Sequence, residues 1–594
     1  MQGQVFITQG DITRLGADAV AVTSGVTFNR WSEGFRALAE HGGGDSFLEA
    51  YERARGARDA WARAFWVPCS GSHAPQGVVF VTVHRGGGPE DRQEPAARAV
   101  REAIQTAVKH LRADTTRPLL VALVAFRMEL GGDREDRVRS ARSQVRAAYD
   151  ALRELPNVDA AFVLDDAGKY DIFLDARRRE REERGLTMAS YDAARLGPLV
   201  EAIRNDECVL FVGAGLSRNA RMPSYHTLIE TLARKLGIDE TLSGDMDTYL
   251  DIAQAYRDAG HSVEEVLGSL FGAGRALPSL AHYLLLSLPI RMVVTTNYDH
   301  LLEHTLEGLR RYPLRVVDHE AISRTGYKDG CCVVKFHGDV EDGQAVLSRD
   351  DYDGFFARRP EMASLLEGLL LNQTFFFVGY SLRDPNFRQI YSKIDLMLRT
   401  FKRPAFTTTF DTVKGYIKDQ YARKQMRLIE LGECSEEQAG RRLLAFLDRL
   451  AEEVSEKTHL FLAPETALED RARREPLAPV AAALAEAGTQ LIAATAGPLS
   501  PEQTRLAAHT LGFLCAHGWR PASGVSITGL WRRLAEKLPP GAESEREKRQ
   551  FLTLALRYAT DGGTASRLRR QLSGTETSEP EPNAERSRNS EGSG

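Results

Sequence analysis

The stretch Cys208-Val-Leu-Phe-Val-Gly-Ala-Gly-Leu-Ser217 decides the fold of the central part of this chain. Five apolar residues end abruptly in a glycine turn, a pattern that predicts a buried strand followed by a loop and a helix. Gly213 and Gly215 have no Cβ, so the backbone can turn tightly and approach a ligand. The N-terminus of the following helix offers free N–H groups and a positive dipole end, which suit a pyrophosphate. We therefore expect a dinucleotide-binding loop.

Three later apolar stretches also end in polar residues, and they strengthen the glycine loop, which lacks the third glycine of the full dinucleotide fingerprint. They are Val293–Asp299 (VVTTNYD), Val333–Asp339 (VVKFHGD) and Phe377–Asn386 (FVGYSLRDPN). Taken singly, each polar residue is explained as a helix cap or a loop residue. Because open α/β sheets bind ligands at the carboxyl ends of their strands, four such strand ends together favour a shared site.

The pattern along the 594 residues predicts an α/β multidomain protein. We expect an α/β domain over 1–180, a Rossmann-type parallel-sheet domain over 190–457, a small all-α domain over 460–572 and a disordered tail over 573–594. Strands are predicted at 5–7, 19–23, 77–83, 119–126, 209–212, 292–295, 332–336, 374–378 and 426–431. The mixed-charge run 175–184 predicts a solvated helix at the first domain boundary.

Composition narrows the class of protein. Hydrophobic and charged contents of 43% and 27%, with a net charge of −5, are typical of a globular protein and give no sign of a nucleic-acid or membrane surface. The six cysteines are scattered, which argues against a disulfide framework or structural zinc and for a reducing compartment. The chain does not start with a signal-peptide pattern, and its longest apolar run, Leu119–Phe126, is short for a membrane span. We expect a cytoplasmic protein without a metal or membrane partner.

The first residues contain the motif Gly10-Asp11-Ile12-Thr13, followed by Ala17-Asp-Ala-Val-Ala-Val22. This opening resembles that of macrodomains, which bind ADP-ribose. The resemblance implies that Asp11, with Ile12 beside it, contacts the adenine. It also implies that Gly131 and Gly132 lie in the loop around the phosphates.

The chain departs from the macrodomain pattern after the second predicted strand. Thr23-Ser24-Gly25 stands where macrodomains usually carry an asparagine pair. The resemblance therefore implies a module that binds its ligand rather than an enzyme that removes ADP-ribose. An inert α/β scaffold domain is the alternative interpretation.

The four strand ends of the central part resemble the sirtuin family, in particular the zinc-free bacterial branch found in antiviral defence effectors. The resemblance covers about residues 195–455 and includes the family's Asn-x-Asp at Asn297 and its His-Gly at His337. The four-cysteine zinc ribbon of the sirtuin deacylases has no counterpart among the cysteines. The resemblance thus implies hydrolysis of NAD to ADP-ribose and nicotinamide, with no metal required.

The resemblance also implies a set of site residues. Those implied in catalysis are Asn297, Asp299 and His337, and those implied in NAD binding are Gly213, Ala214, Gly215, Ser217, Pro223, Thr296, Gly379, Ser381 and Asp384. Asn297 would hold the nicotinamide ribose and the attacking water, and Asp299 the carboxamide or the same water. His337 would act as a general base or as the partner of a ribose hydroxyl.

Three functions agree with these residues. The leading one is an NAD glycohydrolase that depletes NAD as an antiphage effector, triggered by an ADP-ribose-derived signal at the macrodomain-like part or by a phage or partner protein. We expect such a switch to be a homo-oligomer. The alternatives are a sirtuin-type protein ADP-ribosyltransferase or deacylase, and a non-catalytic sensor of NAD or ADP-ribose.

Overall fold

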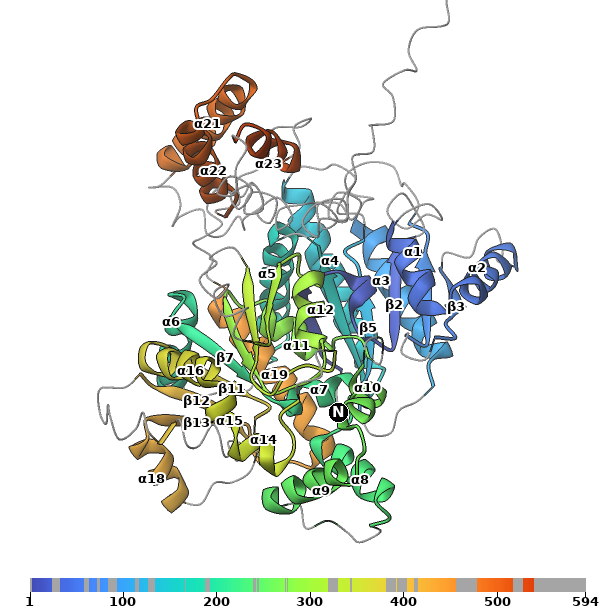
Figure 1. Cartoon of the computed structure of the whole chain (residues 1–594). Coiled ribbons are helices and arrows are strands. Elements are labelled where there is room, and N and C mark those ends of the chain that lie inside the picture. Colours follow the sequence, from blue (N-terminus) through green and yellow to red (C-terminus); the bar gives the residue numbers. More distant parts are fainter. Residues whose placement is uncertain are drawn as a thin grey trace, which may run out of the picture.

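Figure 1 shows the computed structural model of the protein, which describes the chain in separate segments. The described residues are 3–23, 33–57, 64–71, 75–83, 93–112, 117–126, 134–165, 167–186, 193–238, 242, 245–272, 274, 276–318, 330–341, 345–380, 391–392, 403–410, 415–455, 478–516 and 527–538. Among them, no helix is both long and apolar enough to cross a membrane.

The N-terminal part, which we call the macrodomain-like domain, is built on a six-stranded sheet in the order β1-β6-β5-β2-β4-β3. The strands are β1 (Val5–Gln9), β2 (Ala19–Thr23), β3 (Ala64–Pro68), β4 (Gly77–Val81), β5 (Leu119–Leu123) and β6 (Val158–Leu164). Strand β3 runs antiparallel to β4, and the other paired strands are parallel. One face packs against α3 (Gln93–His110), α4 (Arg134–Arg153) and α5 (Ala167–Glu183). Part of the other face is covered by α1 (Glu33–Gly42) and α2 (Asp45–Ala57).

The central domain is built on a parallel seven-stranded sheet in the order β13-β12-β11-β7-β8-β10-β9. The strands are β7 (Cys208–Val212), β8 (Met292–Thr295), β9 (Pro313–Val316), β10 (Cys331–Lys335), β11 (Thr374–Val378), β12 (Ala405–Thr409) and β13 (Met426–Glu430). Strands β7, β10 and β11 are buried along their whole length, as expected for a sheet covered on both faces. The helices that matter below are α6 (Ala193–Arg204), α11 (Leu280–Leu286), α12 (Leu301–Gly308) and α19 (Glu436–Val454).

The central strands end at one level. Val378 pairs with Val212, Val212 with Thr295, and Thr295 with Lys335, so one row of residues crosses four neighbouring strands. The chain leaves β7 toward β8 on one side and later returns to β11 on the other. This reversal places a topological switch point at β7, where open α/β sheets form their ligand crevice.

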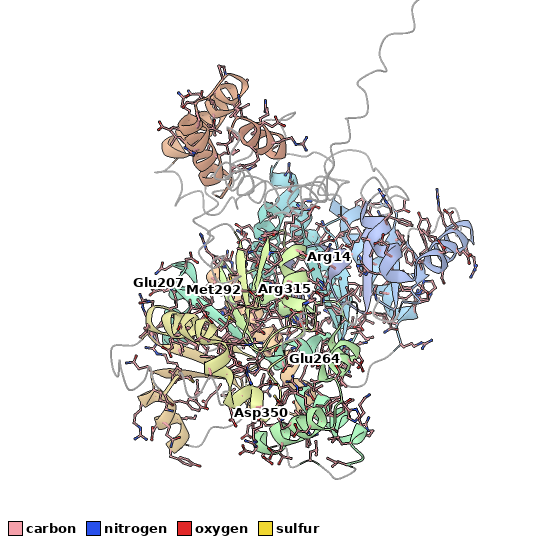
Figure 2. The ribbon with its side chains drawn as sticks, viewed as in Figure 1. Arg14, Glu207, Glu264, Met292, Arg315 and Asp350 are labelled. Atoms are coloured by element: carbon pink, nitrogen blue, oxygen red, sulfur yellow. The ribbon has the colours of Figure 1, made fainter. Side chains whose placement is uncertain are left out.

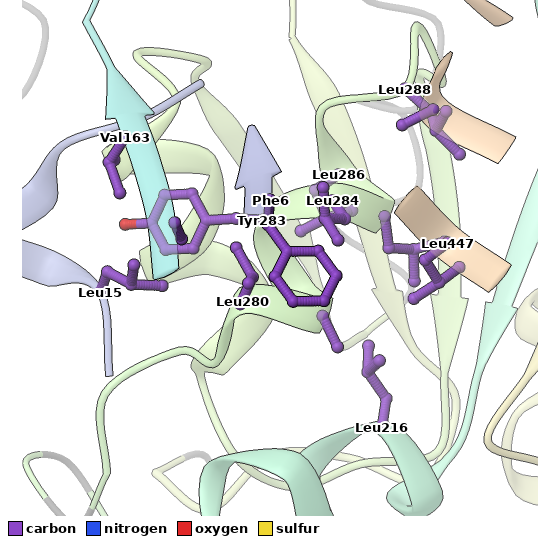
Figure 3. Close-up of a cluster of buried hydrophobic side chains, with 14 of the residues drawn as sticks. Phe6, Leu15, Val163, Leu216, Leu280, Tyr283, Leu284, Leu286, Leu288 and Leu447 are labelled. Atoms are coloured by element: carbon purple, nitrogen blue, oxygen red, sulfur yellow. The ribbon is translucent and has the colours of Figure 1, made fainter. Parts of the chain in front are cut away.

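The two sheets share one hydrophobic core. The face of the N-terminal sheet that carries Phe6 packs on α11 of the central domain (Figure 3). The cluster combines Phe6, Leu15 and Val163 with Leu216, Leu280, Tyr283 and Leu447. A Cβ on Gly10 would lie 2.4 Å from the Tyr283 ring, so the approach of the two domains requires glycine there. The contact buries apolar side chains from both domains, which therefore support each other.

The run 175–184 is helical as predicted, since residues 175–183 lie in α5, but the expectation that this helix is solvated is wrong. Arg177 is fully buried, and Glu180 is 4% exposed. The Arg177 guanidinium donates to Asp448 at 2.6 Å and pairs with Glu452 at 2.8 Å, and both acids lie on α19. A run of alternating charge is compatible with a solvent-exposed helix and also with a helix that forms ion pairs at a buried interface. The sequence pattern alone does not distinguish the two.

The predicted strands are all present, and the structure adds β3, β6, β9 and β12. In β6 the polar Asp159 and two alanines weaken the strand pattern. Asp159 is accommodated because it pairs with Arg441 of the central domain at 3.0 Å. The helices α21 (Ala478–Ala496), α22 (Pro501–Ala516) and α23 (Ile527–Glu536) pack together, as expected for the all-α part. The predicted tail over 573–594 lies outside the described residues.

Replacing Arg177 by Met should strongly destabilise the protein, because the carboxylate of Asp448 would stay buried without its cation and Glu452 would keep only its pair with Arg181. Loss of one partner of a buried ion pair costs about 3–5 kcal/mol. The matched control is Arg178→Met on the same helix, since the Arg178 side chain is 36% exposed and pairs locally with Asp175. Thermal unfolding of both variants tests this, and equal midpoints would contradict it.

Candidate active site

The glycine loop after β7 is held by the loop after β11. The N–H of Gly213 donates to Val378 O, and the N–H of Gly215 donates to Gly379 O, both at 2.9 Å. A Cβ on Gly213 would lie 2.5 Å from Gly379 O, and one on Gly215 would lie 2.9 Å from Gly379 Cα. Gly379 itself has a φ of +65°. The glycines are therefore needed first for backbone-to-backbone packing of these two loops.

The helix behind the loop is shorter than the sequence suggested. It is the single turn α7 (Ala214–Ser217), followed by a 3-10 turn at Arg218–Ala220. Ala214 begins this turn, and Ser217 ends it as a buried side chain that is 3% exposed. The loop thus delivers one buried hydroxyl to the end of the sheet.

Ser217, Asn297 and Asp299 form one buried hydrogen-bonded chain. Asn297 Nδ2 donates to Ser217 Oγ at 3.0 Å, and Ser217 Oγ donates to Asp299 Oδ2 at 2.9 Å. The second oxygen of Asp299 accepts from the N–H of Leu301 at 3.0 Å and so supports the start of α12. Each carboxylate oxygen thus accepts one hydrogen bond within the protein.

This chain fixes the orientation of the Asn297 amide. The Ser217 hydroxyl gives its proton to a carboxylate, so its oxygen can only accept from Asn297, and the NH₂ group of the amide must face it. Asn297 Oδ1 therefore points the other way. It is buried, and it makes no hydrogen bond within the described part of the chain. An orphaned buried acceptor of this kind suits the hydroxyl of a bound ligand or a water.

His337 follows β10 as Asn297 follows β8, each two residues beyond the paired Thr295 and Lys335. Its backbone oxygen accepts from the N–H of Val346 at 2.9 Å. Its ring, 4% exposed, meets the Tyr352 ring edge-on with centroids 5.3 Å apart. The register therefore brings the predicted histidine and asparagine to adjacent strand ends.

A buried ionic group lies beneath these strand ends. Asp339 accepts from His300 Nε2 at 2.8 Å and pairs with Lys335 Nζ at 2.9 Å. Burial by itself raises the pKa of Asp339, but the His300 hydrogen bond and the Lys335 charge outweigh burial and hold that pKa below its ordinary range. Sequence reasoning missed Lys335, although a lysine inside the apolar run of β10 was a visible signal.

His300, Asp339 and Glu341 are close enough together to offer ligands to a metal ion. The two carboxylates among them already form ion pairs within the protein. Lys335 pairs with Asp339, and Arg315 pairs with Glu341 at 3.2 Å. Two cations beside these donors oppose the entry of a third.

The remaining predicted NAD-binding residues lie around this site or outside the described chain. Thr296 is half-buried, and its N–H donates to Val212 O at 3.4 Å. Pro223 lies between Arg221, which has a φ of 62°, and the N-cap of α8 (Tyr225–Lys235). Ser381 and Asp384 fall outside the described residues, as do Gly131 and Gly132 of the N-terminal prediction.

Asp11 lies where the two domains meet. Its Oδ1 accepts from the N–H and the hydroxyl of Thr13, at 3.0 and 2.7 Å, and so caps the 3-10 turn η1 (Ile12–Arg14), in which Ile12 is buried. The next residue, Arg14, donates to Glu307 of α12 at 2.6 Å. Figure 2 shows Arg14 at the border between the blue N-terminal ribbon and the central domain.

The loop over residues 10–18, which we call the interdomain loop, touches both segments that build the site. Arg14 reaches α12, which follows Asn297 and Asp299. Asp18 accepts from Arg221 at 3.0 Å, four residues after Ser217. The N-terminal domain therefore contacts the two chain segments that follow the site residues.

The central part of the chain is similar to known proteins. The SIR2-like domain family matches residues 291–429. The NAD(+) hydrolase ThsA of Enterococcus faecium is 33% identical over 215 residues, which is 35% of this chain and 44% of the relative. ThsA of Bacillus cereus is 30% identical over 213 residues, or 34% and 44%. The chain thus spans less than half of these relatives. "Defense-associated sirtuin 2" of Bacillus subtilis is 25% identical over 241 residues, or 39% and 24%.

Solved macrodomains are similar to the N-terminal part. The Oceanobacillus iheyensis macrodomain with ADP matches 30% of this chain and 91% of its own, at 17% identity and a TM-score of 0.25. The same macrodomain with MES bound matches 30% and 92%, at 16% identity and a TM-score of 0.25. By sequence, the central part of this chain therefore contains a SIR2-like domain over residues 291–429, on the parallel seven-stranded sheet that follows the N-terminal six-stranded α/β sheet.

Proposed function

We propose that this protein is an NAD glycohydrolase, which converts NAD and water to ADP-ribose and nicotinamide. The observation that carries the proposal is the buried chain from Asn297 through Ser217 to Asp299 at the switch point of the sheet, with Asn297 Oδ1 left as an acceptor. The similarity of this chain to relatives named NAD(+) hydrolase ThsA supports it. We also propose that the chain is divided into three domains, over residues 1–180, 190–457 and 460–572.

The residues suit the chemistry of the step. The bond from ribose C1′ to the nicotinamide nitrogen breaks, its electron pair stays on that nitrogen, and water adds to C1′ and releases a proton. Positive charge develops on the ribose, and an amide oxygen held close to it stabilises that charge. We assign this role, and the orientation of the water, to Asn297 Oδ1. His337 takes the proton of the water or orders a ribose hydroxyl.

Asp299 has a further role in this proposal beyond the one expected from the sequence. Each of its oxygens accepts a hydrogen bond from the protein, so we propose that it orients Ser217 and the start of α12, in addition to the expected contact with the carboxamide or the water. As part of this proposal we assign the binding of the rest of NAD to the residues that the sirtuin resemblance implies, which are Gly213, Ala214, Gly215, Ser217, Pro223, Thr296, Gly379, Ser381 and Asp384.

We further propose that hydrolysis serves antiphage defence, in a cytoplasmic homo-oligomer that depletes NAD when triggered. The trigger is an ADP-ribose-derived ligand at Asp11 or a partner protein. The name "Defense-associated sirtuin 2" of a relative supports the defence role. The interdomain loop supports a link between Asp11 and the site, because it contacts both site segments.

Asn297→Ala and His337→Ala should each lower the rate of NAD hydrolysis by about 10²–10⁴-fold, because each removes a group that acts on the reacting ribose or water. The measurement is nicotinamide release from NAD, with and without an acylated peptide. His110→Ala, an exposed histidine on α3, is the control and should keep full activity. Wild-type rates in both site variants would remove them from catalysis, and turnover that needs the peptide would favour a transferase or deacylase.

A chelator should change neither the melting temperature nor NAD turnover, because Lys335 and Arg315 already neutralise the carboxylates nearest His300. Structural metals stabilise the fold, so their removal lowers the melting temperature. Elemental analysis of the purified protein completes the test. Stoichiometric zinc, or activity lost to the chelator and restored by a metal, would contradict the metal-free site.

Asp11→Ala should weaken the binding of ADP-ribose and its cyclic or conjugated derivatives, and any activation by them, while basal NAD hydrolysis persists. The control is Thr13→Val, which removes the side-chain hydrogen bond to Asp11 but keeps the carboxylate. Binding is followed by calorimetry on the full chain, in an Asn297→Ala background that spares the ligand. If these ligands bind the Asp11→Ala variant as well as its parent, the sensor role fails.

A further inference from the structure

We propose that Lys335 is a positioning residue that fastens the Asn297–Asp299 segment to the His337–Asp339 segment. The proposal rests on the proposed function, because it concerns the same site. The two segments follow β8 and β10, which pair side by side up to Thr295 and Lys335. Beyond this row the two segments leave the sheet, and the hydrogen bonds between strands β8 and β10 no longer hold the segments together.

Lys335 makes hydrogen bonds to both of these segments. An ammonium has three N–H donors, and Lys335 Nζ uses three acceptors. It donates to the backbone oxygen of Tyr298 at 3.1 Å and to that of Asp299. The third contact is the Asp339 carboxylate at 2.9 Å. Two acceptors thus belong to the segment that carries Asn297, and one belongs to the segment that carries His337.

Acidic side chains surround the Lys335 ammonium. The Lys335 side chain is fully buried, where an uncompensated charge is strongly unfavourable. Asp339 is fully buried as well, and Glu303 of α12 lies 3.6 Å from Nζ. Asp339 is in turn held by His300 and by the N–H of Glu341 at 2.9 Å. The acceptor of the ammonium is therefore itself fixed in place.

A second contact runs parallel to the lysine. The N–H of Val340 donates to Tyr298 O at 3.2 Å, and the Tyr298 hydroxyl donates to Val346 O at 2.8 Å. The carbonyl oxygen of Tyr298 therefore accepts hydrogen bonds from the Lys335 ammonium and from the N–H of Val340, the residue after Asp339. Tyr298 lies directly between Asn297 and Asp299, so its position sets the direction of both side chains.

This arrangement predicts a kinetic effect that a purely stabilising residue would not have. Small displacements of reacting groups cost about 10²-fold in rate, while binding through the nucleotide loop is preserved. Loss of the ammonium should therefore lower kcat and leave KM for NAD nearly unchanged. Loss of stability alone lowers the amount of folded protein and leaves kcat per folded molecule intact.

The test compares Lys335→Met and Asp339→Asn with Leu447→Ala in the full chain. Met has nearly the length of lysine but no donor, and Asn keeps the size of Asp339 and removes its charge. Leu447 is buried on α19 away from these segments, and its truncation matches the loss of stability. We expect kcat to fall about 10–100-fold in Lys335→Met, less in Asp339→Asn, and not in Leu447→Ala.

Amide hydrogen exchange provides a readout that does not need activity. Exchange should quicken over residues 296–303 and 337–341 in the two site variants and stay as in wild type there in Leu447→Ala. Unchanged exchange and kcat in both site variants would overturn the proposal. If Lys335→Met does not fold, Asp339→Asn decides. If the wild type does not hydrolyse NAD, the proposed function fails while exchange still tests the positioning.

Discussion

The contact between the backbones of Gly213, Gly215 and Gly379 determines where the site is built. It joins the loops after β7 and β11 at the switch point of the sheet, at a separation that no side chain could tolerate. With these loops in contact, Ser217 is delivered to the neighbouring end of β8, where it meets Asn297 and Asp299. The same contact means that a substitution at any of the three glycines would displace the hydroxyl as well as the crevice.

The macrodomain-like domain is part of the same folded unit as the site. The Tyr283 ring occupies the space that a Cβ on Gly10 would need, and Arg177 pairs with two acids of α19. Both sheets contribute side chains to one hydrophobic core. A domain that shares a core cannot move independently as one on a flexible linker does. A signal that arrives there must act by shifting the balance between two packed arrangements, and it can do so only by binding one of them more tightly.

The sequence was sufficient for the local features and insufficient for the distant ones. Strands β7, β8, β10 and β11 and the polar residues after them follow from short apolar runs, so Asn297 and His337 could be placed at strand ends. That these two ends are adjacent is known only from the order of the strands in the sheet. The burial of Arg177 could not be predicted, since its partners Asp448 and Glu452 lie more than 270 residues away. The charge of Lys335 was visible in β10, but its acceptors are carbonyl oxygens of another segment, and carbonyls leave no mark in a sequence.

Helix α12 connects these features physically. Its first turn follows Asn297 and is capped by Asp299, Glu303 lies near Lys335, and Glu307 in its last turn pairs with Arg14. Eight residues of helix span about 12 Å and behave as a rigid body. Asp11 holds η1 through Thr13, so a ligand that took the Asp11 carboxylate, as we propose, would compete with that cap and loosen the turn that carries Arg14. The Arg14 pair with Glu307 would then be the point at which such a change reaches the helix, whose opposite end follows Asn297.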